Sequence, residues 1–144
     1  MKTFTYTVCL NKCFLLLFIL TGLSVAQVSE SWSIRYNGPG SSTDKSNAIA
    51  VDHLGNIFVA GTSPSVGFGT EDYTTIKYDS AGVEQWVARY NGTGSSVDNV
   101  YALAVDEGGF IYVTGGSSGS GSSFDFLTIK YSSAGDTIWT RRYN

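Results

Sequence analysis

The sequence predicts an all-β fold built from four-stranded units in tandem, and three observations support this prediction. The tripeptide Arg-Tyr-Asn occurs three times, each time three residues after a tryptophan, in residues 32–37, 86–91 and 139–144. The tryptophans are 54 and then 53 residues apart, a period typical of repeating β-architectures. Glycine turns separate short apolar runs, and no segment sustains a helical period of 3.6 residues.

The repeat extends well beyond the tripeptide. Residues 35–61 and 89–115 align without a gap and are identical at 16 of 27 positions. Residues 72–86 and 125–139 are identical at 9 of 15, after a deletion of one residue. The deletion falls in the Ser/Gly-rich stretch between Ser63 and Glu71, where a surface loop would tolerate it.

Each unit contains four candidate strands. In the first unit, residues 47–52 alternate Ile49 and Val51 with alanines, and the turn at residues 53–56 contains Gly55. Residues 57–62 are β-branched and aromatic, residues 73–79 alternate two faces, and residues 84–90 carry Trp86 after a turn at residues 80–82. The matching strands of the second unit are expected at residues 101–106, 110–114, 126–132 and 136–143.

Repeated four-stranded antiparallel units with apolar residues on both faces are typical of β-propeller blades, because each blade is packed between two neighbours. The predicted repeat region is 27–144, with a lone fourth strand at 27–37, blade 1 at 38–91 and blade 2 at 92–144. Propellers have four to eight blades, so two complete blades cannot close a ring. The chain is therefore expected to be a fragment of a larger propeller; the alternative is that several copies assemble into one ring. A β-sandwich is a weaker alternative, because it has no reason to repeat its sequence every 53 or 54 residues.

Residues 1–26 have the pattern of a secretory signal peptide. Lys2 and Lys12 precede an apolar run, and Ser24-Val25-Ala26 resembles a cleavage site before Gln27. The apolar run is shorter than the roughly 20 residues of a membrane span, so no span is expected after cleavage. The expected location is secreted or at the cell surface.

Cleavage would change the composition of the chain. Both cysteines, Cys9 and Cys13, would leave with the signal peptide, which excludes thiol catalysis and cysteine-bound zinc. The remaining chain would have 7 basic and 12 acidic residues, a net charge of −5. This acidity argues against nucleic acid and anionic membrane surfaces as partners.

Several segments resemble a known repeat. They are Ala48-Ile49-Ala50-Val51-Asp52, Gly55-Asn56-Ile57-Phe58-Val59, Thr75-Ile76-Lys77-Tyr78-Asp79, and their counterparts around Ala102, Ile111 and Thr128. They resemble the bacterial SBBP repeat, named for a seven-bladed β-propeller, over essentially all of residues 32–144. The resemblance implies an exported or surface protein, often large and modular, and no catalytic residue set. This sequence departs from that picture in showing only two complete repeats, and no carboxy-terminal anchoring domain is expected within residues 27–144.

The histidine and the repeated aspartates are the first candidate site residues. His53 is the only histidine, its counterpart is Glu107, and an exposed turn residue is expected rather than a Ser-His-Asp triad. Aspartates recur in pairs: Asp44 and Asp98, Asp52 and Asp106, Asp72 and Asp125. They are oxygen ligands of the kind that calcium takes, but no dense acidic run exists, and hydrogen bonds to nearby turn backbone are favoured.

The repeated aromatic and basic residues are also candidates. The aromatic set could stack on sugars, but packing is favoured; it comprises Trp32, Trp86, Trp139, Tyr36, Tyr90 and Tyr143. The basic set is expected to pair with the aspartates between blades; it comprises Arg35, Arg89, Arg142, Lys77 and Lys130. The glycine-rich stretches at 38–42, 92–96 and 115–123 lack the Gly-Lys-Ser of a phosphate loop and are expected to be rim loops.

The sequence therefore predicts a non-catalytic, secreted or cell-surface propeller module that binds a protein or glycan through its rim loops, or serves as a structural scaffold. No catalytic, cofactor-binding or metal-binding residue is predicted, and no cofactor. The alternative is the N-terminal fragment of a propeller hydrolase or lyase whose active site lies in missing blades.

Overall fold

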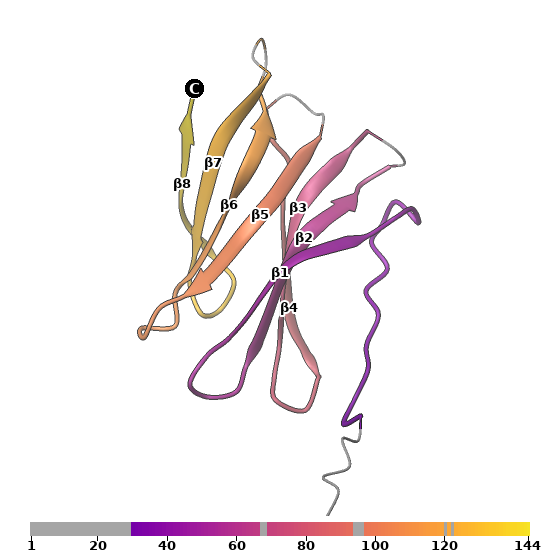
Figure 1. Ribbon diagram of the computed structural model, residues 1–144, viewed down its shortest axis with the longest axis vertical. Coiled ribbons are helices and arrows are strands. Elements are labelled where there is room, and N and C mark those ends of the chain that lie inside the picture. The colour runs from indigo at the N-terminus through magenta and orange to yellow at the C-terminus, as the bar shows by residue number, and fades with distance from the viewer. Residues whose placement is uncertain (1–29, 67–68, 94–96, 120, 122) are drawn as a thin grey trace, which may run out of the picture.

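The computed structural model describes residues 30–66, 69–93, 97–119, 121 and 123–144, and this part of the chain contains eight strands and no helix. The strands form two antiparallel sheets of four, each ordered as in the sequence (Figure 1). Blade 1 consists of β1 (Lys45–Val51), β2 (Ile57–Pro64), β3 (Glu71–Tyr78) and β4 (Glu84–Tyr90). Blade 2 consists of β5 (Asp98–Val105), β6 (Ile111–Ser118), β7 (Phe124–Tyr131) and β8 (Thr137–Tyr143). The predicted fold class is confirmed, whereas the predicted signal peptide at 1–26 lies outside the described residues.

The first strand of each blade begins earlier than the sequence predicted. Lys45 pairs with Thr62, and Asp98 pairs with Ser117, on the far side of a β-bulge in each first strand. A glycine of the second strand, Gly61 or Gly115, lies beside the bulge. A Cβ at Gly61 would overlap the carbonyl oxygen of Lys45, so glycine is required there by the close approach of two backbones.

Each sheet has two apolar faces, set by the alternation of side chains along paired strands. In blade 1 the leading face carries Ile49, Val51, Ile57, Val59, Ile76 and Tyr78, and the trailing face carries Phe58, Ala60, Tyr73, Trp86, Ala88 and Tyr90. In blade 2 the leading face carries Leu103, Val105, Ile111, Val113, Leu127, Ile129 and Tyr131, and the trailing face carries Tyr112, Phe126, Trp139 and Tyr143.

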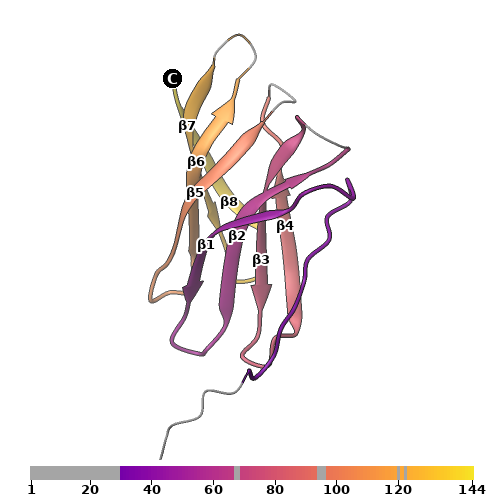
Figure 2. The same cartoon turned by 45° about the vertical axis from the view of Figure 1, so that its right-hand side comes forward.

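The core lies between the two sheets. The trailing face of blade 1 packs against the leading face of blade 2, and together they form one hydrophobic cluster. Tyr73, Ile111 and Leu127 are fully buried in it. Figure 2 shows the sheets lying face to face, with β5 running alongside the strands of blade 1.

The two ends of the sheets differ in their connections. The end that carries the four turns within hairpins, at residues 52–56, 79–83, 106–110 and 132–136, is called the tight-turn rim. The opposite end carries the connections at residues 65–70, 91–97 and 119–123 and is called the long-loop rim. The two rims lie at opposite ends of the molecule in Figure 1.

Residues 30–37, the lead segment, precede the first blade. They run alongside the leading face of blade 1 (Figures 1 and 2), and no described residue of this segment is assigned to a strand. The assignment of residues 27–37 to a fourth strand of another blade stays a prediction. No helix long and apolar enough to cross a membrane occurs in the described part of the chain.

Candidate functional site

The tight-turn rim is built on aspartates that bind their own turns. Asp52 Oδ1 accepts hydrogen bonds from the amides of Leu54 and Asn56, both at 2.9 Å. Asp106 accepts from the Phe110 amide at 3.0 Å and from the Tyr112 hydroxyl at 3.0 Å. The turn role predicted for these two aspartates is confirmed.

Asp79 and Ser132 bind the backbone of their own turns in the same way, although the sequence analysis did not identify them. Asp79 Oδ1 accepts from the amides of Ala81 and Val83. Ser132 Oγ accepts from the amides of Ala134 and Asp136 in the matching turn of blade 2. The signal was available, since each lies two to four residues before a turn glycine.

Arg89 holds together the long-loop end of blade 1. Its guanidinium donates to the Ser63 carbonyl at 2.6 Å, to Ser63 Oγ at 2.9 Å and to Asp72 Oδ2 at 3.2 Å. Burial raises the pKa of Asp72, and the hydrogen bond and charge of Arg89 partly offset this effect. Arg89 therefore supplies a charge that offsets part of the cost of burying this carboxylate.

Arg142 repeats this arrangement in blade 2. It donates to Asp125 Oδ2 at 2.8 Å, to the Ser117 carbonyl at 2.9 Å and to Ser117 Oγ at 2.6 Å. Both ion pairs join the third and fourth strands of one sheet. The prediction that these arginines pair between blades is wrong, because neighbouring strands of one sheet bring the aspartate within reach first.

The repeated lysines make other contacts than the two ion pairs. Lys77 donates from Nζ to the carbonyl of Ser133 in blade 2, at 3.2 Å. Lys130 lies over the rings of Phe110 and Tyr112, 4.0 Å and 5.0 Å from their centroids. These are contacts of a cation with a carbonyl dipole and aromatic faces. The hydrogen bond from the Phe110 amide and the charge of Lys130 both help to lower the pKa of Asp106 in the same blade. None of these contacts is the predicted pairing with an aspartate of another blade.

Asp44 and Asp98 fasten the entry to each blade. Asp44 Oδ2 accepts from the Gly38 amide at 2.9 Å, and Asp98 Oδ2 accepts from the Gly92 amide at 2.6 Å. Each aspartate in the three predicted pairs thus has a backbone or arginine partner, as the structural interpretation expected. Among the described residues, no group of three or more His, Cys, Asp or Glu side chains lies close enough to share a metal ion.

His53 lies exposed in the β1–β2 turn. This is the place that the sequence predicted for it, and its counterpart Glu107 is exposed in the matching turn. Parts of two predicted rim loops, residues 94–96, 120 and 122, lie outside the described residues. The predicted loop at 115–123 is wrong for residues 115–118, which belong to β6 and pair with β7.

Trp86 joins the two blades. Its ring lies 6.1 Å from Phe58 and 6.3 Å from Tyr131 of blade 2, and its Nε1 donates to the Ser133 carbonyl at 3.1 Å. A Cβ added to Gly135 would come within 2.8 Å of this indole. The predicted packing role is confirmed for Trp86. Glycine at position 135 leaves room for the indole, because it has no Cβ.

Trp32 of the lead segment sits on blade 1 as Trp86 sits on blade 2. It lies 6.4 Å from Tyr78, the counterpart of Tyr131, and against Gly82, the counterpart of Gly135, where an added Cβ would lie 2.7 Å from the indole. Tyr36 accepts a hydrogen bond from Arg89 at 3.3 Å. The lead segment therefore occupies the position on blade 1 that β4 occupies on blade 2.

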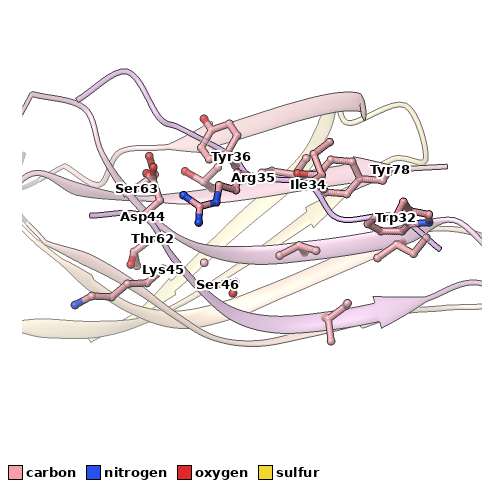
Figure 3. Close-up of a pocket in the computed structure, with 16 residues that line it drawn as sticks. Trp32, Ile34, Arg35, Tyr36, Asp44, Lys45, Ser46, Thr62, Ser63 and Tyr78 are labelled. Atoms are coloured by element: carbon pink, nitrogen blue, oxygen red, sulfur yellow. The ribbon is translucent and has the colours of Figure 1, made fainter. Parts of the chain in front are cut away.

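A pocket of about 400 Å³ separates the lead segment from the leading face of blade 1. Figure 3 shows Trp32 beside Tyr78 at one end, and Arg35, Asp44 and Ser63 gathered toward the other. The apolar part of its lining consists of Ile34, Ile49, Ile57, Val59 and Ile76. The sequence analysis did not identify this face as a site. The repeat pattern shows which residues face a neighbouring blade, but not which of these faces is left uncovered.

Comparison with known proteins identifies the family. The SBBP family, described as a β-propeller repeat, matches residues 31–69 and 85–121, which together make up more than half of the chain. No curated protein sequence matched the chain. The matched segments contain β1, β2, β5 and β6, together with all but the first residue of the lead segment and of β4. The chain belongs to the SBBP family of β-propeller repeat proteins.

Proposed function

We propose that this chain contributes blades to a non-catalytic, exported propeller that binds a protein or glycan through its long-loop rim. The supporting observation is the difference between the two rims. Every turn of the tight-turn rim is held by an aspartate or serine that binds the turn backbone. The long-loop rim instead presents connections that vary in length and sequence between the two blades. Binding specificity on a fixed scaffold usually resides in such loops.

The long-loop rim also exposes large apolar side chains. Val66, in the β2–β3 connection, and Phe124, at the start of β7, are exposed hydrophobic residues at this end. The tight-turn rim exposes Leu54 and Val83 to a similar extent, and Leu54 is suitable for a control.

The binding proposal is tested with defined probes. The chain from Gln27 to Asn144 is applied to an array of purified glycans and to a peptide array, next to the variants Val66→Ser, Phe124→Ser and Leu54→Ser. We expect binding that the first two variants weaken and the third leaves intact. No binding to either array, or equal loss in all three variants, would contradict the proposal. Turnover in a screen of glycoside and ester substrates would favour the enzyme alternative.

Export rests on the sequence of residues 1–26. We expect a secreting host that expresses the full sequence to release a chain whose first residue is Gln27. Mass spectrometry of the protein in the medium measures this directly. Retention of Met1 on a cell-associated product would contradict the export proposal.

A further inference from the structure

We propose that Asn37 and Asn91 are deamidation sites, and that a buried aspartate in each repeat slows their reaction. Each of these asparagines is followed by glycine, and no other asparagine in the sequence is. Deamidation converts the side-chain amide into a carboxylate without an enzyme, and water is its only co-reactant. This modification is independent of what the long-loop rim binds.

The reaction joins the asparagine side chain to the backbone of the next residue. The backbone nitrogen of Gly92 attacks Cγ of Asn91 and forms a bond to it. The bond from Cγ to the side-chain nitrogen breaks, and that nitrogen leaves as ammonia with the proton of the backbone amide. Water then opens the remaining succinimide ring at either carbonyl, which gives aspartate or isoaspartate. Glycine permits this attack most readily, because it has no Cβ to obstruct the approach.

The two reacting groups at Asn91 lie in different environments. Asn91 is exposed, whereas Gly92 is buried and its amide donates to Asp98 Oδ2 at 2.6 Å. The amide must give up this acceptor and its proton before its nitrogen can attack. A carboxylate opposes both changes, because it holds the N–H in a charge-assisted hydrogen bond and repels the negative charge that deprotonation leaves. Asp98 is therefore placed to slow the reaction.

Close packing restrains Gly92 further. A Cβ added to Gly92 would lie 2.5 Å from Ser117 Oγ and 2.7 Å from Asp98 Oδ1. Ser117 Oγ in turn accepts a hydrogen bond from Arg142. The glycine is thus held against a cluster of blade 2, and its amide cannot turn toward the Asn91 side chain without leaving that cluster.

Blade 1 repeats the arrangement at Asn37. Asn37 is exposed, Gly38 is buried, and the Gly38 amide donates to Asp44 Oδ2 at 2.9 Å. A Cβ added to Gly38 would overlap Ser63 Oγ, which belongs to the corresponding serine of β2. The same restraint on the same reaction therefore occurs in both repeats.

The two aspartates differ in burial. Asp98 is fully buried, whereas Asp44 is only partly buried and makes the longer of the two hydrogen bonds. Water competes more easily for a partly exposed carboxylate, so the amide of blade 1 is released more often. We therefore expect Asn37 to deamidate before Asn91 in the folded protein.

The first test compares the folded and the unfolded protein. The purified protein is aged at mildly alkaline pH with and without urea, and peptide mapping by mass spectrometry follows the conversion of each asparagine. Asn91 should react at least about tenfold faster in urea, the scale expected for the loss of one hydrogen bond to a charged group. Equal rates in the two conditions, or no conversion in either, would overturn the proposal. Faster reaction at Asn91 than at Asn37 in the folded protein would show that aspartate burial does not set the rate.

The second test assigns the effect to each aspartate. Asp98→Ala should speed the reaction of Asn91 about tenfold and leave Asn37 unchanged, and Asp44→Ala should do the reverse. Each variant is the matched control of the other, because a general loss of folding would speed both sites at once. Folded variants that leave the rate at their own asparagine unchanged would refute the role of the carboxylates.

A third variant covers the case in which alanine at position 98 prevents folding. Asp98→Asn keeps the shape of the side chain and removes its charge, so Asn91 should react faster than in the parent but more slowly than in urea. Thermal melts verify that the variant is folded. A parent-like rate at Asn91 would show that the charge of Asp98 does not restrain the Gly92 amide.

Discussion

Asp52 and Asp106 illustrate how single side chains determine the shape of the tight-turn rim. Burial opposes ionisation of Asp52, but hydrogen bonds from Asn56 and Leu54 outweigh it and hold the pKa of Asp52 below its usual value of 3.8. The hydrogen bond from the Phe110 amide lowers the pKa of Asp106 in the same way. In both turns the ionised carboxylate accepts hydrogen bonds from backbone amides that have no backbone acceptor within the turn.

Replacing Asp52 by alanine should cost about 1 kcal/mol of unfolding free energy, the usual cost of removing a side chain that caps backbone amides. Because the folded pKa lies below 3.8, the contribution of the charge is complete above that pH and disappears as the pH falls through the folded pKa. Melting curves of parent and variant should therefore differ at pH 7 and converge in strong acid. Equal melting temperatures at pH 7 would contradict the turn role.

Arg142 and Arg141 are adjacent on β8 and offer a matched pair of substitutions. Arg142→Ala leaves Asp125 and the Ser117 carbonyl without the guanidinium, and the aspartate side chain is only 5% exposed. We expect a loss of about 2 kcal/mol, less than the 3–5 kcal/mol typical of a fully buried pair, because Arg142 is itself partly exposed.

Arg141→Ala is the control. Arg141 is exposed, donates to the carbonyl of its neighbour Thr140 and lies 5.9 Å from the centroid of the Trp139 ring. Exposed contacts of this kind contribute little, so its removal should change stability only slightly. Urea unfolding of the two variants measures the difference. Equal destabilisation by both substitutions would show that the Ser117–Asp125–Arg142 cluster is not what fastens β8.

At the scale of the element, each first strand is held against the second by a bulge and a glycine. Alanine at Gly61 would force the β1 backbone away at Lys45, whereas Gly69 has open space around it and positive φ of 82°. Gly61→Ala should therefore be severely destabilising, and Gly69→Ala should cost only about 1 kcal/mol of backbone strain. Denaturant titrations compare the two, and a similar cost at both sites would refute the close-approach argument.

The strands themselves were largely predictable. β4 matches its predicted bounds, and β2 and β3 differ from theirs at the long-loop end by two residues, because alternation and turn glycines mark most boundaries. β6 runs four residues further than predicted, to Ser118, because its two glycines pair within the sheet instead of ending the strand. The bulges were not predictable: Lys45 and Asp98 pair beyond an extra residue that breaks the alternation. The partner of each arginine was not predictable either, since the repeat supplies several equivalent aspartates and only the strand order selects one.

At the scale of the whole molecule, stability rests on the apolar layer between two sheets. The residues that would fill this layer were recognisable from the sequence, because the strands carry apolar residues on both faces. The open face of blade 1 was not, because the repeat marks it as an interface without showing what covers it.

The pKa of Tyr131 depends on how deeply this side chain is buried in the layer. Burial between the blades raises its pKa from 10.0 to about 12. A raised folded pKa means that the stability is complete below pH 10, the unfolded value, and is lost as the pH rises through the folded value. Between pH 10 and pH 12, the Tyr131→Phe variant should therefore lose less unfolding free energy than the parent. Unfolding curves at several alkaline pH values measure this difference. The same alkaline loss in both proteins would place Tyr131 outside the core.

The stacking of the two blades is tested most directly by proton NMR of Gly135 and Trp86, which lie 49 residues apart in sequence and in different blades. The account predicts nuclear Overhauser contacts between the Trp86 indole and Gly135, together with an upfield ring-current shift of the Gly135 α-protons that Trp86→Leu abolishes. Gly135 protons without such contacts, and with a shift that Trp86→Leu leaves unchanged, would contradict it.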